Sequence, residues 1–189
     1  MAHLREITLP ETKPALEWVN GRALQKVSPK RRHALAQTKF AVALDSWACS
    51  ARAGMVGTEW RFRLAPPDEV RRPLVPDVAF LSYARMPYAA QLETEVPDIA
   101  PDIAVEILSP GDRAADVAEK VRVYLASGSA VVILVDPNSQ TVMIHEPSGT
   151  WSLGADDVFE HVALPGFYLA VVDLFTPPPP PISQISSIP

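Results

Sequence analysis

Apolar and polar positions alternate along this chain with two different periods, which predicts a fold of mixed helices and strands. Helical spacing of apolar residues runs from 31 to 51, and a second helix is predicted from 112 to 127 with Asp112 as its N-cap. We predict strands at 59–64, 75–81, 101–110, 130–135 and 141–146, a hairpin around Asn20-Gly21, and a short closing helix at 169–175.

The stretch from 101 to 135 carries the strongest topological signal. A strand at 101–110 is followed by a helix and then by 130–135, an apolar, β-branched run typical of a strand buried on both faces. Two strands joined through a helix are expected to lie parallel in one sheet. The predicted fold class is therefore α/β, a mixed β-sheet flanked by helices.

Two other segments have patterns that predict their local structure: 59–64 and the connection between the strands at 75–81 and 101–110. The strict alternation of Glu59–Leu64 predicts a half-exposed strand with Trp60, Phe62 and Leu64 on one face. Between the strands at 75–81 and 101–110 the chain passes through Pro87 and Pro97, and a long connection of this kind is typical of a functional or mobile loop.

Length and composition indicate one hydrophobic core. The chain has 189 residues, of which 48% are hydrophobic and 21% charged, close to the average of globular domains. We expect one domain over residues 1–175 and a Pro-rich tail over 176–189, which is either a disordered end or a ligand for a proline-binding domain. No apolar run reaches the roughly 18 residues of a membrane span, and Met1–Pro14 lacks a signal-peptide core, so a cytoplasmic protein is expected.

The cysteine content and the charge of the chain limit which metal sites and which binding partners are expected. Cys49 is the only cysteine, which excludes an internal disulfide and a cysteine-rich zinc cluster and fits a reducing compartment. The net charge of -5 argues against binding nucleic acid by bulk attraction alone. Lys and Arg are nevertheless concentrated in residues 1–95, and Asp and Glu in residues 96–189. One half could attract a polyanion while the other supplies carboxylates to a cation, or the two halves simply form differently solvated surfaces.

Glu106 interrupts the run Pro101–Pro110, which otherwise reads as a buried strand. An ionised carboxylate among apolar neighbours is costly unless a metal ion or a lysine compensates it. Alternation places Glu106 on one strand face with Asp102, but at about 3.3 Å per residue the two lie roughly 13 Å apart, too far for one small metal ion to bridge.

Asp77 is the expected partner of Glu106, because it opens the preceding strand. Side chains on adjacent strands approach to within about 5 Å, which suits joint binding of Mg²⁺ by two carboxylates and water. The alternatives are structural: Asp77 caps a turn after Pro76, and Glu106 pairs with an arginine across the sheet.

At these residues the chain resembles a bacterial family of putative restriction endonuclease domains within the PD-(D/E)XK nuclease superfamily. The resemblance covers most of residues 14–175 and is carried by Glu17, His33, Pro76-Asp77-Val78, Pro101–Pro110, Asp116, Glu119-Lys120, Tyr124 and Val135-Asp136-Pro137. It implies a restriction-endonuclease-like sheet, Mg²⁺ or Mn²⁺ as cofactor, and hydrolysis of phosphodiester bonds in DNA, with Asp77 and Glu106 as metal ligands.

The chain departs from the superfamily pattern at Leu108, where a lysine normally follows the glutamate by two residues. The resemblance implies that Lys120, on the following helix, takes the role of that lysine and positions the attacking water. The alternative is a surface ion pair between Asp116 and Lys120, which are four residues apart on one helix.

Glu17 and His33 occupy the family's N-terminal motif positions, where a further acid near the metal is implied. The structural alternatives are a carboxylate that solvates a strand edge and a surface or capping histidine. Lys30, Arg31 and Arg32 adjoin His33 and are candidates, with it, for contact with nucleic acid, or else form a solvated basic cluster.

The sequence therefore predicts a metal-dependent nuclease with Asp77, Glu106, Lys120 and Glu17 in its active site. No Gly-rich phosphate loop, Gly-x-Ser-x-Gly elbow or His-Glu-x-x-His helix is present. Two alternatives stay open: a catalytically inactive nuclease fold that binds nucleic acid or a protein, and a structural dimer with the 60–64 strand face as its interface. A homodimer also fits the nuclease hypothesis, since nucleases of this fold often dimerise to cut two strands.

Overall fold

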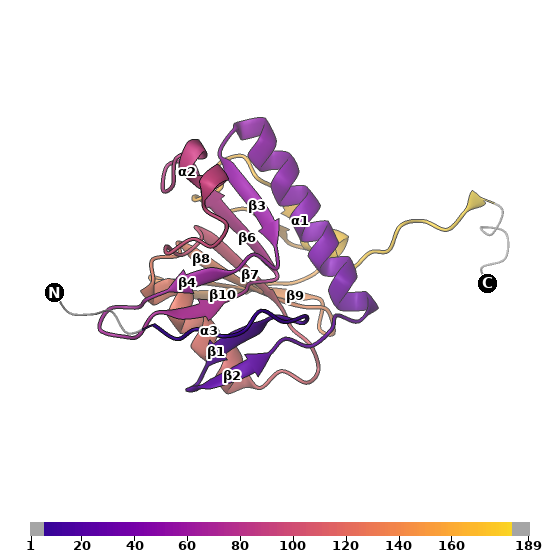
Figure 1. Cartoon of the computed structure of the whole chain (residues 1–189). Coiled ribbons are helices and arrows are strands. Elements are labelled where there is room, and N and C mark those ends of the chain that lie inside the picture. The colour runs from indigo at the N-terminus through magenta and orange to yellow at the C-terminus, as the bar shows by residue number, and fades with distance from the viewer. Residues whose placement is uncertain (1–5, 183–189) are drawn as a thin grey trace.

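A six-stranded mixed sheet forms the centre of the computed structural model, which describes residues 6–182. The strand order is β10-β9-β8-β7-β6-β3, with β7 and β8 parallel and all other neighbours antiparallel (Figure 1). The strands are β3 (Gly54–Thr58), β6 (Val78–Ser82), β7 (Ile103–Ile107), β8 (Val131–Asp136), β9 (Thr141–Glu146) and β10 (Gly149–Leu153). The predicted α/β fold class is confirmed, and so is the parallel pair joined through a helix.

Three helices accompany the sheet: α1 (Arg31–Ala51), α2 (Tyr88–Glu93) and α3 (Ala114–Ala126). The first of these has the bounds that the sequence predicts. Its buried residues follow one another at intervals of four and form an apolar stripe against the sheet: Ala36, Phe40, Leu44 and Ala48. Arg52 ends α1 in the left-handed conformation, with φ 52°.

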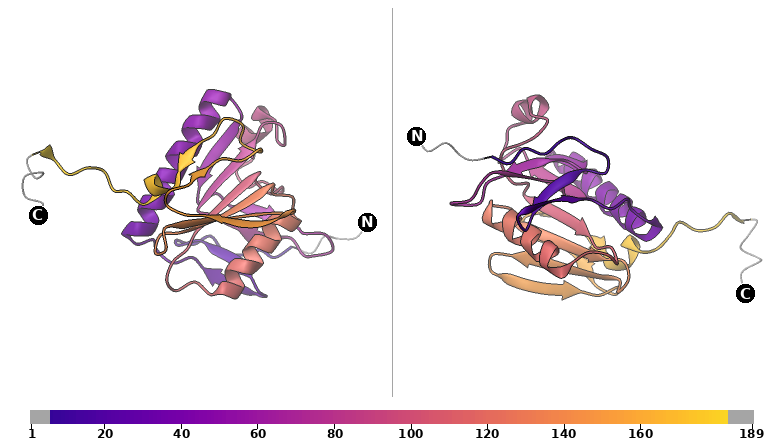
Figure 2. Two further views of the ribbon diagram at one scale, coloured as in Figure 1. Left: turned by 180° about the vertical axis from the view of Figure 1, so that it is seen from behind. Right: turned by 60° about the horizontal axis from the view of Figure 1, so that its bottom comes forward.

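Short strand pairs complete the fold. They are β1 (Leu16–Val19) with β2 (Arg22–Gln25), β4 (Phe62–Leu64) with β5 (Arg72–Leu74), and β11 (Val158–Phe159) with β12 (Leu169–Ala170). The last pair leads into the 3-10 helix η1 (Val171–Leu174), which contacts α1; Figure 2 shows this C-terminal segment beside α1 when the molecule is seen from behind.

The sheet separates two apolar cores, and strand β7 contributes to both. Ile103, Val105 and Ile107 enter the core that contains α1, whereas Ala104 enters the core formed with α3, β1, β4 and β5. Because side chains alternate along a strand, Glu106 points to the same side as Ala104. The alternation of β7 therefore delivers the carboxylate of Glu106 into the layer that contains α3.

The predicted strand over Glu59–Leu64 was wrong in its bounds. Glu59 adopts a left-handed conformation with φ 53°, which turns the chain, and only Phe62–Leu64 form a strand, outside the main sheet. The edge strand β3, which precedes this turn, was missed. Phe62 and Leu64 are fully buried in the core on the α3 side, which contradicts their assignment to a dimer interface.

The N-cap that the sequence predicts for α3 was wrong. Asp112 does not cap α3: the N-cap position is Arg113, and Asp112 instead accepts a hydrogen bond from the Ser109 backbone N–H at 2.8 Å. The long connection between β6 and β7 contains the short helix α2. The closing helix predicted at 169–175 is confirmed over Val171–Leu174 as the 3-10 helix η1, whereas Leu169–Ala170 form β12.

The ends of the chain are described in part. Residues 176–182 of the predicted tail extend away from the sheet in Figure 1, and residues 183–189 lie outside the described part of the chain. None of the helices within residues 6–182 has the length and hydrophobicity needed to cross a membrane.

Candidate functional site

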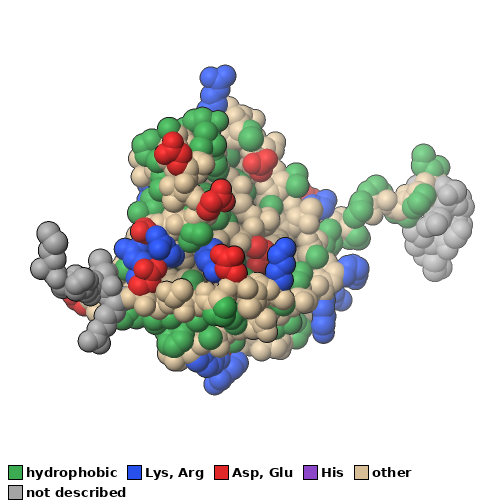
Figure 3. Space-filling view, viewed as in Figure 1, with side chains coloured by type: hydrophobic (Ala, Val, Ile, Leu, Met, Phe, Trp, Pro, Cys, Tyr) green, Lys and Arg blue, Asp and Glu red, His purple; other side chains and the backbone are tan. Residues whose placement is uncertain are grey.

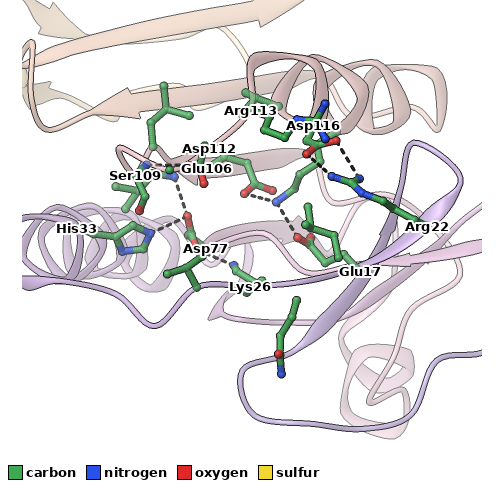
Figure 4. Close-up of a pocket in the computed structure, with 18 residues that line it drawn as sticks. Glu17, Arg22, Lys26, His33, Asp77, Glu106, Ser109, Asp112, Arg113 and Asp116 are labelled. Atoms are coloured by element: carbon green, nitrogen blue, oxygen red, sulfur yellow. Dashed lines mark hydrogen bonds and ion pairs between the residues drawn. The ribbon is translucent and has the colours of Figure 1, made fainter.

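A pocket of about 160 Å³ opens where the β1–β2 hairpin, the start of α1, the end of β7 and α3 meet. The predicted site residues Glu17, Asp77, Glu106 and Lys120 all line it, although they come from four separate segments. Figure 4 shows Glu17, Asp77 and Glu106 pointing into this pocket. The four residues are only 2 to 8% exposed. Figure 3 shows acidic and basic side chains gathered in a band across the middle of this face of the molecule.

The register of two neighbouring strands brings the two predicted metal ligands together. Val78 at the start of β6 pairs with Val105 of β7 in antiparallel register. Asp77, one residue before β6, is therefore opposite Glu106, one residue further along β7. The expected convergence of the two carboxylates is a direct result of this pairing.

The carboxylate of Asp77 is held from three directions. Its Oδ2 accepts a hydrogen bond from the Ile107 backbone N–H at 2.7 Å, and Nε2 of His33 lies 3.3 Å from the same oxygen. Its Oδ1 accepts a hydrogen bond from the ammonium group of Lys26 at 2.6 Å. Asp77 thus joins β7, α1 and the segment after β2, rather than capping a local turn.

Glu106 is compensated by a lysine and a tyrosine of α3, not by an arginine. Its Oε2 pairs with Nζ of Lys120, and its Oε1 accepts a hydrogen bond from the Tyr124 hydroxyl at 3.0 Å. Lys120 and Tyr124 are four residues apart and therefore share one face of the helix. A surface ion pair between Asp116 and Lys120 is contradicted, because Lys120 is buried and faces the sheet.

Glu17 enters the pocket from the β1–β2 hairpin. Its Oε2 lies 3.1 Å from Nζ of Lys120, and its Oε1 accepts a hydrogen bond from the Val75 backbone N–H at 2.8 Å. Glu17 is therefore a second anionic partner of Lys120 rather than a solvated residue at a strand edge.

The hairpin is fastened to α3 by a bidentate ion pair. Arg22 reaches Asp116 with nitrogen–oxygen distances of 2.7 and 3.1 Å, and the Asn20 amide donates to the same carboxylate at 2.8 Å. Asn20 and Gly21 form the hairpin turn with φ 48° and 73°, a conformation that favours an Asn-Gly pair. The local turn sequence thus fixes the position from which Glu17 reaches the pocket.

Lys26 was missed by the sequence analysis. It lies one residue beyond β2, and its Nζ donates to Asp77 Oδ1, to the Val75 carbonyl at 2.9 Å and to Glu59 Oε1 at 3.1 Å. The one available signal was its place at the end of the strand that pairs with the strand of Glu17.

The basic residues Lys30, Arg31 and Arg32 lie at the start of α1 and are exposed. Within residues 6–182 none of them forms an ion pair. They line a second hollow of about 400 Å³ that shares His33, Leu108 and Ser109 with the first pocket. The two hollows therefore adjoin each other, and three cations that form no ion pair in the described part of the chain border the second.

The proximity of these groups shifts their pKa values in opposite directions. Burial raises the pKa of Glu106 to about 7, although the Lys120 ammonium opposes the shift. Burial alone would raise the pKa of Asp77, but the contact with His33 and the charges of Lys26 and Lys120 outweigh it and hold this pKa well below its usual value. Burial would lower the pKa of Lys120, but the surrounding carboxylates raise it above its usual range. Burial thus works against the ionised form of Glu106, whereas the contacts of Asp77 favour its ionised form.

The donors in the pocket fit a small, hard divalent cation. Asp77 and Glu106 present two carboxylates from adjacent strands, and Mg²⁺ binds to one or two carboxylates while it keeps several waters. Across residues 6–182 no three His, Cys, Asp or Glu side chains gather into a complete metal-binding group. No cysteine lines the pocket, so a thiolate zinc site does not fit.

Comparison with known proteins supports the same interpretation of fold and family. The family Uma2, described as putative restriction endonuclease, matches residues 3–171. A crystal structure of a putative nuclease belonging to DUF820, from Anabaena variabilis ATCC 29413, is 27% identical and superimposes with a TM-score of 0.78. The match covers 88% of this chain and 93% of that one. None of the curated proteins compared with the chain matches it.

Proposed function

Since the chain belongs to the Uma2 family of putative restriction endonucleases, we propose that it hydrolyses phosphodiester bonds of DNA with the help of Mg²⁺ or Mn²⁺. The observation that carries this proposal is the convergence of two carboxylates from adjacent strands and a buried lysine in one pocket. Asp77 and Glu106 would hold the ion. A bound divalent cation lowers the pKa of its water and offsets negative charge that develops on a phosphate.

Lys120 supplies the amine that the superfamily pattern places at position 108. Its ammonium lies against Glu106, so a water near that carboxylate is within reach of an N–H donor. Glu17 holds Lys120 from the other side, and the Tyr124 hydroxyl holds the second oxygen of Glu106. Lys120 and Glu106 are thereby kept in fixed orientations, which is the requirement for positioning a nucleophile.

The charge at the start of α1 supports a nucleic-acid substrate. Lys30, Arg31 and Arg32 have no acidic partner in the described part of the chain and border the hollow that adjoins the pocket. A phosphate backbone that enters the pocket would pass these cations, and His33 would face the junction of the two hollows. The net charge of -5 makes such local contacts necessary for binding a polyanion.

One observation favours an alternative function. Both predicted metal ligands are already paired with lysines, Asp77 with Lys26 and Glu106 with Lys120, so the pocket is nearly neutral without an ion. A nuclease fold that has lost metal binding and only binds nucleic acid would have this arrangement.

Cleavage of supercoiled plasmid and of single-stranded DNA, with Mg²⁺, Mn²⁺ or a chelator, tests the proposal. We expect Asp77→Asn, Glu106→Gln and Lys120→Met each to slow cleavage at least about a hundredfold, because each removes a charged group from the reaction centre. Asp45→Asn and Glu93→Gln are matched controls, since both residues are exposed and lie outside the pocket. Undiminished cleavage by the three variants would refute the assigned roles, and DNA binding without cleavage or metal binding would favour the alternative.

A further inference from the structure

Lys26 is a second lysine of the pocket, with a partly buried side chain, and its role is not explained by the proposed chemistry. Its side chain is 12% exposed, and its ammonium group makes three hydrogen bonds, to Asp77, Val75 and Glu59. Burial would lower the pKa of Lys26, but the charges of Asp77 and Glu106 raise it above its usual value, so the ammonium stays charged.

The two oxygens of Asp77 are not equally available. Oδ2 is held by the Ile107 backbone N–H, which belongs to the sheet and cannot move away independently. Oδ1 is held by Lys26 alone, through a flexible side chain. A cation that binds Asp77 through Oδ1 must therefore share this oxygen with Lys26 or replace it.

The charges at the centre of the pocket also indicate a replaceable cation. When ionised, Glu17, Asp77 and Glu106 outnumber Lys26 and Lys120 by one, which leaves a formal charge of -1. The other charged lining residues are balanced in sign: Arg22 and Arg113 against Asp112 and Asp116. A divalent cation makes the centre +1, and one phosphodiester group then makes it neutral. With both lysines retained, the pocket has the charge that suits one metal ion together with one phosphate.

We propose that Lys26 is a resident counter-ion: it occupies the metal's place on Asp77 in the free protein and moves to the substrate phosphate when the metal binds. This inference rests on the proposed function. A lysine side chain has a flexible four-carbon stem, so the ammonium group of Lys26 can leave Oδ1 of Asp77 while the backbone of the hairpin stays in place. Displacing Lys26 from Asp77 then makes metal binding less favourable, and the contact of Lys26 with the phosphate makes substrate binding more favourable. Binding of the metal and binding of the substrate are thereby coupled.

Calorimetric titration with Mn²⁺ tests the first half of the proposal. We expect Lys26→Met and Lys26→Gln to bind Mn²⁺ about tenfold more tightly than the wild type or more, because each removes a unit charge beside the cation site. Lys26→Gln keeps a side-chain donor for Asp77, which guards against misfolding of the Met variant, and far-ultraviolet circular dichroism verifies the fold. Lys39→Met is the matched control: Lys39 lies on α1, does not line the pocket and makes no ion pair in residues 6–182.

Binding of a single-stranded phosphorothioate oligonucleotide, which resists cleavage, tests the second half. Mn²⁺ should raise the affinity of the wild type and of Lys39→Met for this probe, and should raise it about tenfold less in the two Lys26 variants. Mn²⁺ affinity in these variants equal to or weaker than that of the wild type would overturn the proposal, and so would an unchanged gain in oligonucleotide affinity. If the wild type neither binds Mn²⁺ nor cleaves DNA, the proposed function itself fails. If the wild type does both, but the Lys26 variants match it in Mn²⁺ affinity and in the gain in oligonucleotide affinity, only this inference is refuted.

Discussion

Replacing Lys120 by Met gives the sharpest test of how the pocket is stabilised. The side chain of Lys120 is 10% exposed, and its ammonium faces the carboxylates of Glu106 and Glu17. Met keeps the length of the side chain and removes the charge, so both carboxylates lose their cationic partner while packing is largely preserved. Breaking a buried ion pair in this way typically costs about 3–5 kcal/mol.

The pH dependence of this loss has a definite sign. Without the ammonium, burial and the neighbouring carboxylate raise the pKa of Glu106 further above its unfolded value. A carboxyl group whose folded pKa is raised destabilises the protein above that pKa, and the penalty shrinks as the pH falls toward the unfolded value near 4.5. The Lys120→Met variant is therefore expected to be most destabilised at pH 8 and much less so at pH 5.

Urea unfolding at pH 5 and at pH 8 measures the effect directly. For a chain of this length a loss of about 3–5 kcal/mol corresponds to a decrease in Tm of about 6–20 °C. The double variant Glu106→Gln/Lys120→Met should regain part of the stability at pH 8, because it buries one uncompensated charge fewer. An equal penalty at both pH values, together with no recovery in the double variant, would refute the electrostatic reasoning and assign the loss to packing.

Three other outcomes are expected. Mn²⁺ affinity should be about tenfold higher at pH 8 than at pH 6, because a proton competes with the ion for Glu106, whose pKa is raised by burial to about 7. Calorimetry that shows the same Mn²⁺ affinity at both pH values would contradict the role of Glu106 as a metal ligand. Replacing residues 30–32 together by alanine should make the salt dependence of DNA binding less steep. The slope of log affinity against log salt concentration should shrink in magnitude by about 3, at roughly 0.9 for each of three lost phosphate contacts, while Mn²⁺ affinity stays unchanged. Arg22→Ala should lower the free energy of unfolding only slightly at pH 7, since its ion pair with Asp116 is partly exposed. Because Arg22 holds the pKa of Asp116 near 2, below its usual value, this difference should begin to shrink below about pH 4 and be lost only below about pH 2. Denaturant curves at pH 7 and pH 2.5 measure this, and an undiminished difference at pH 2.5 would contradict it.

Elements with an uninterrupted hydrophobic period were predictable. The bounds of α1 follow from apolar residues at intervals of four, and the direction of Glu106 follows from the alternation of β7. The opposition of Asp77 and Glu106 required one assumption, that two consecutive predicted strands are neighbours. The sheet satisfies it, since β6 and β7 pair.

The remaining features depend on contacts that no local pattern encodes. The segment at 59–64 alternates as a strand should, yet Glu59 adopts a left-handed conformation that this alternation does not indicate. Lys26 and Asp77 are 51 residues apart, and Lys120 and Glu17 are 103 apart. Their pairing follows from the docking of the hairpin on α3, which a reading of the sequence element by element does not supply.

The β1–β2 hairpin contributes Glu17 and carries Lys26 at its end, but it belongs to no strand pairing of the main sheet. A partial opening that released it would cost far less than unfolding the sheet, since small peripheral units with few backbone partners open first. The sheet and α1 could then persist intact while the reaction centre had come apart. Under mild stress such a protein would lose the proposed activity before it denatures, and it would regain that activity once β1 and β2 returned to place.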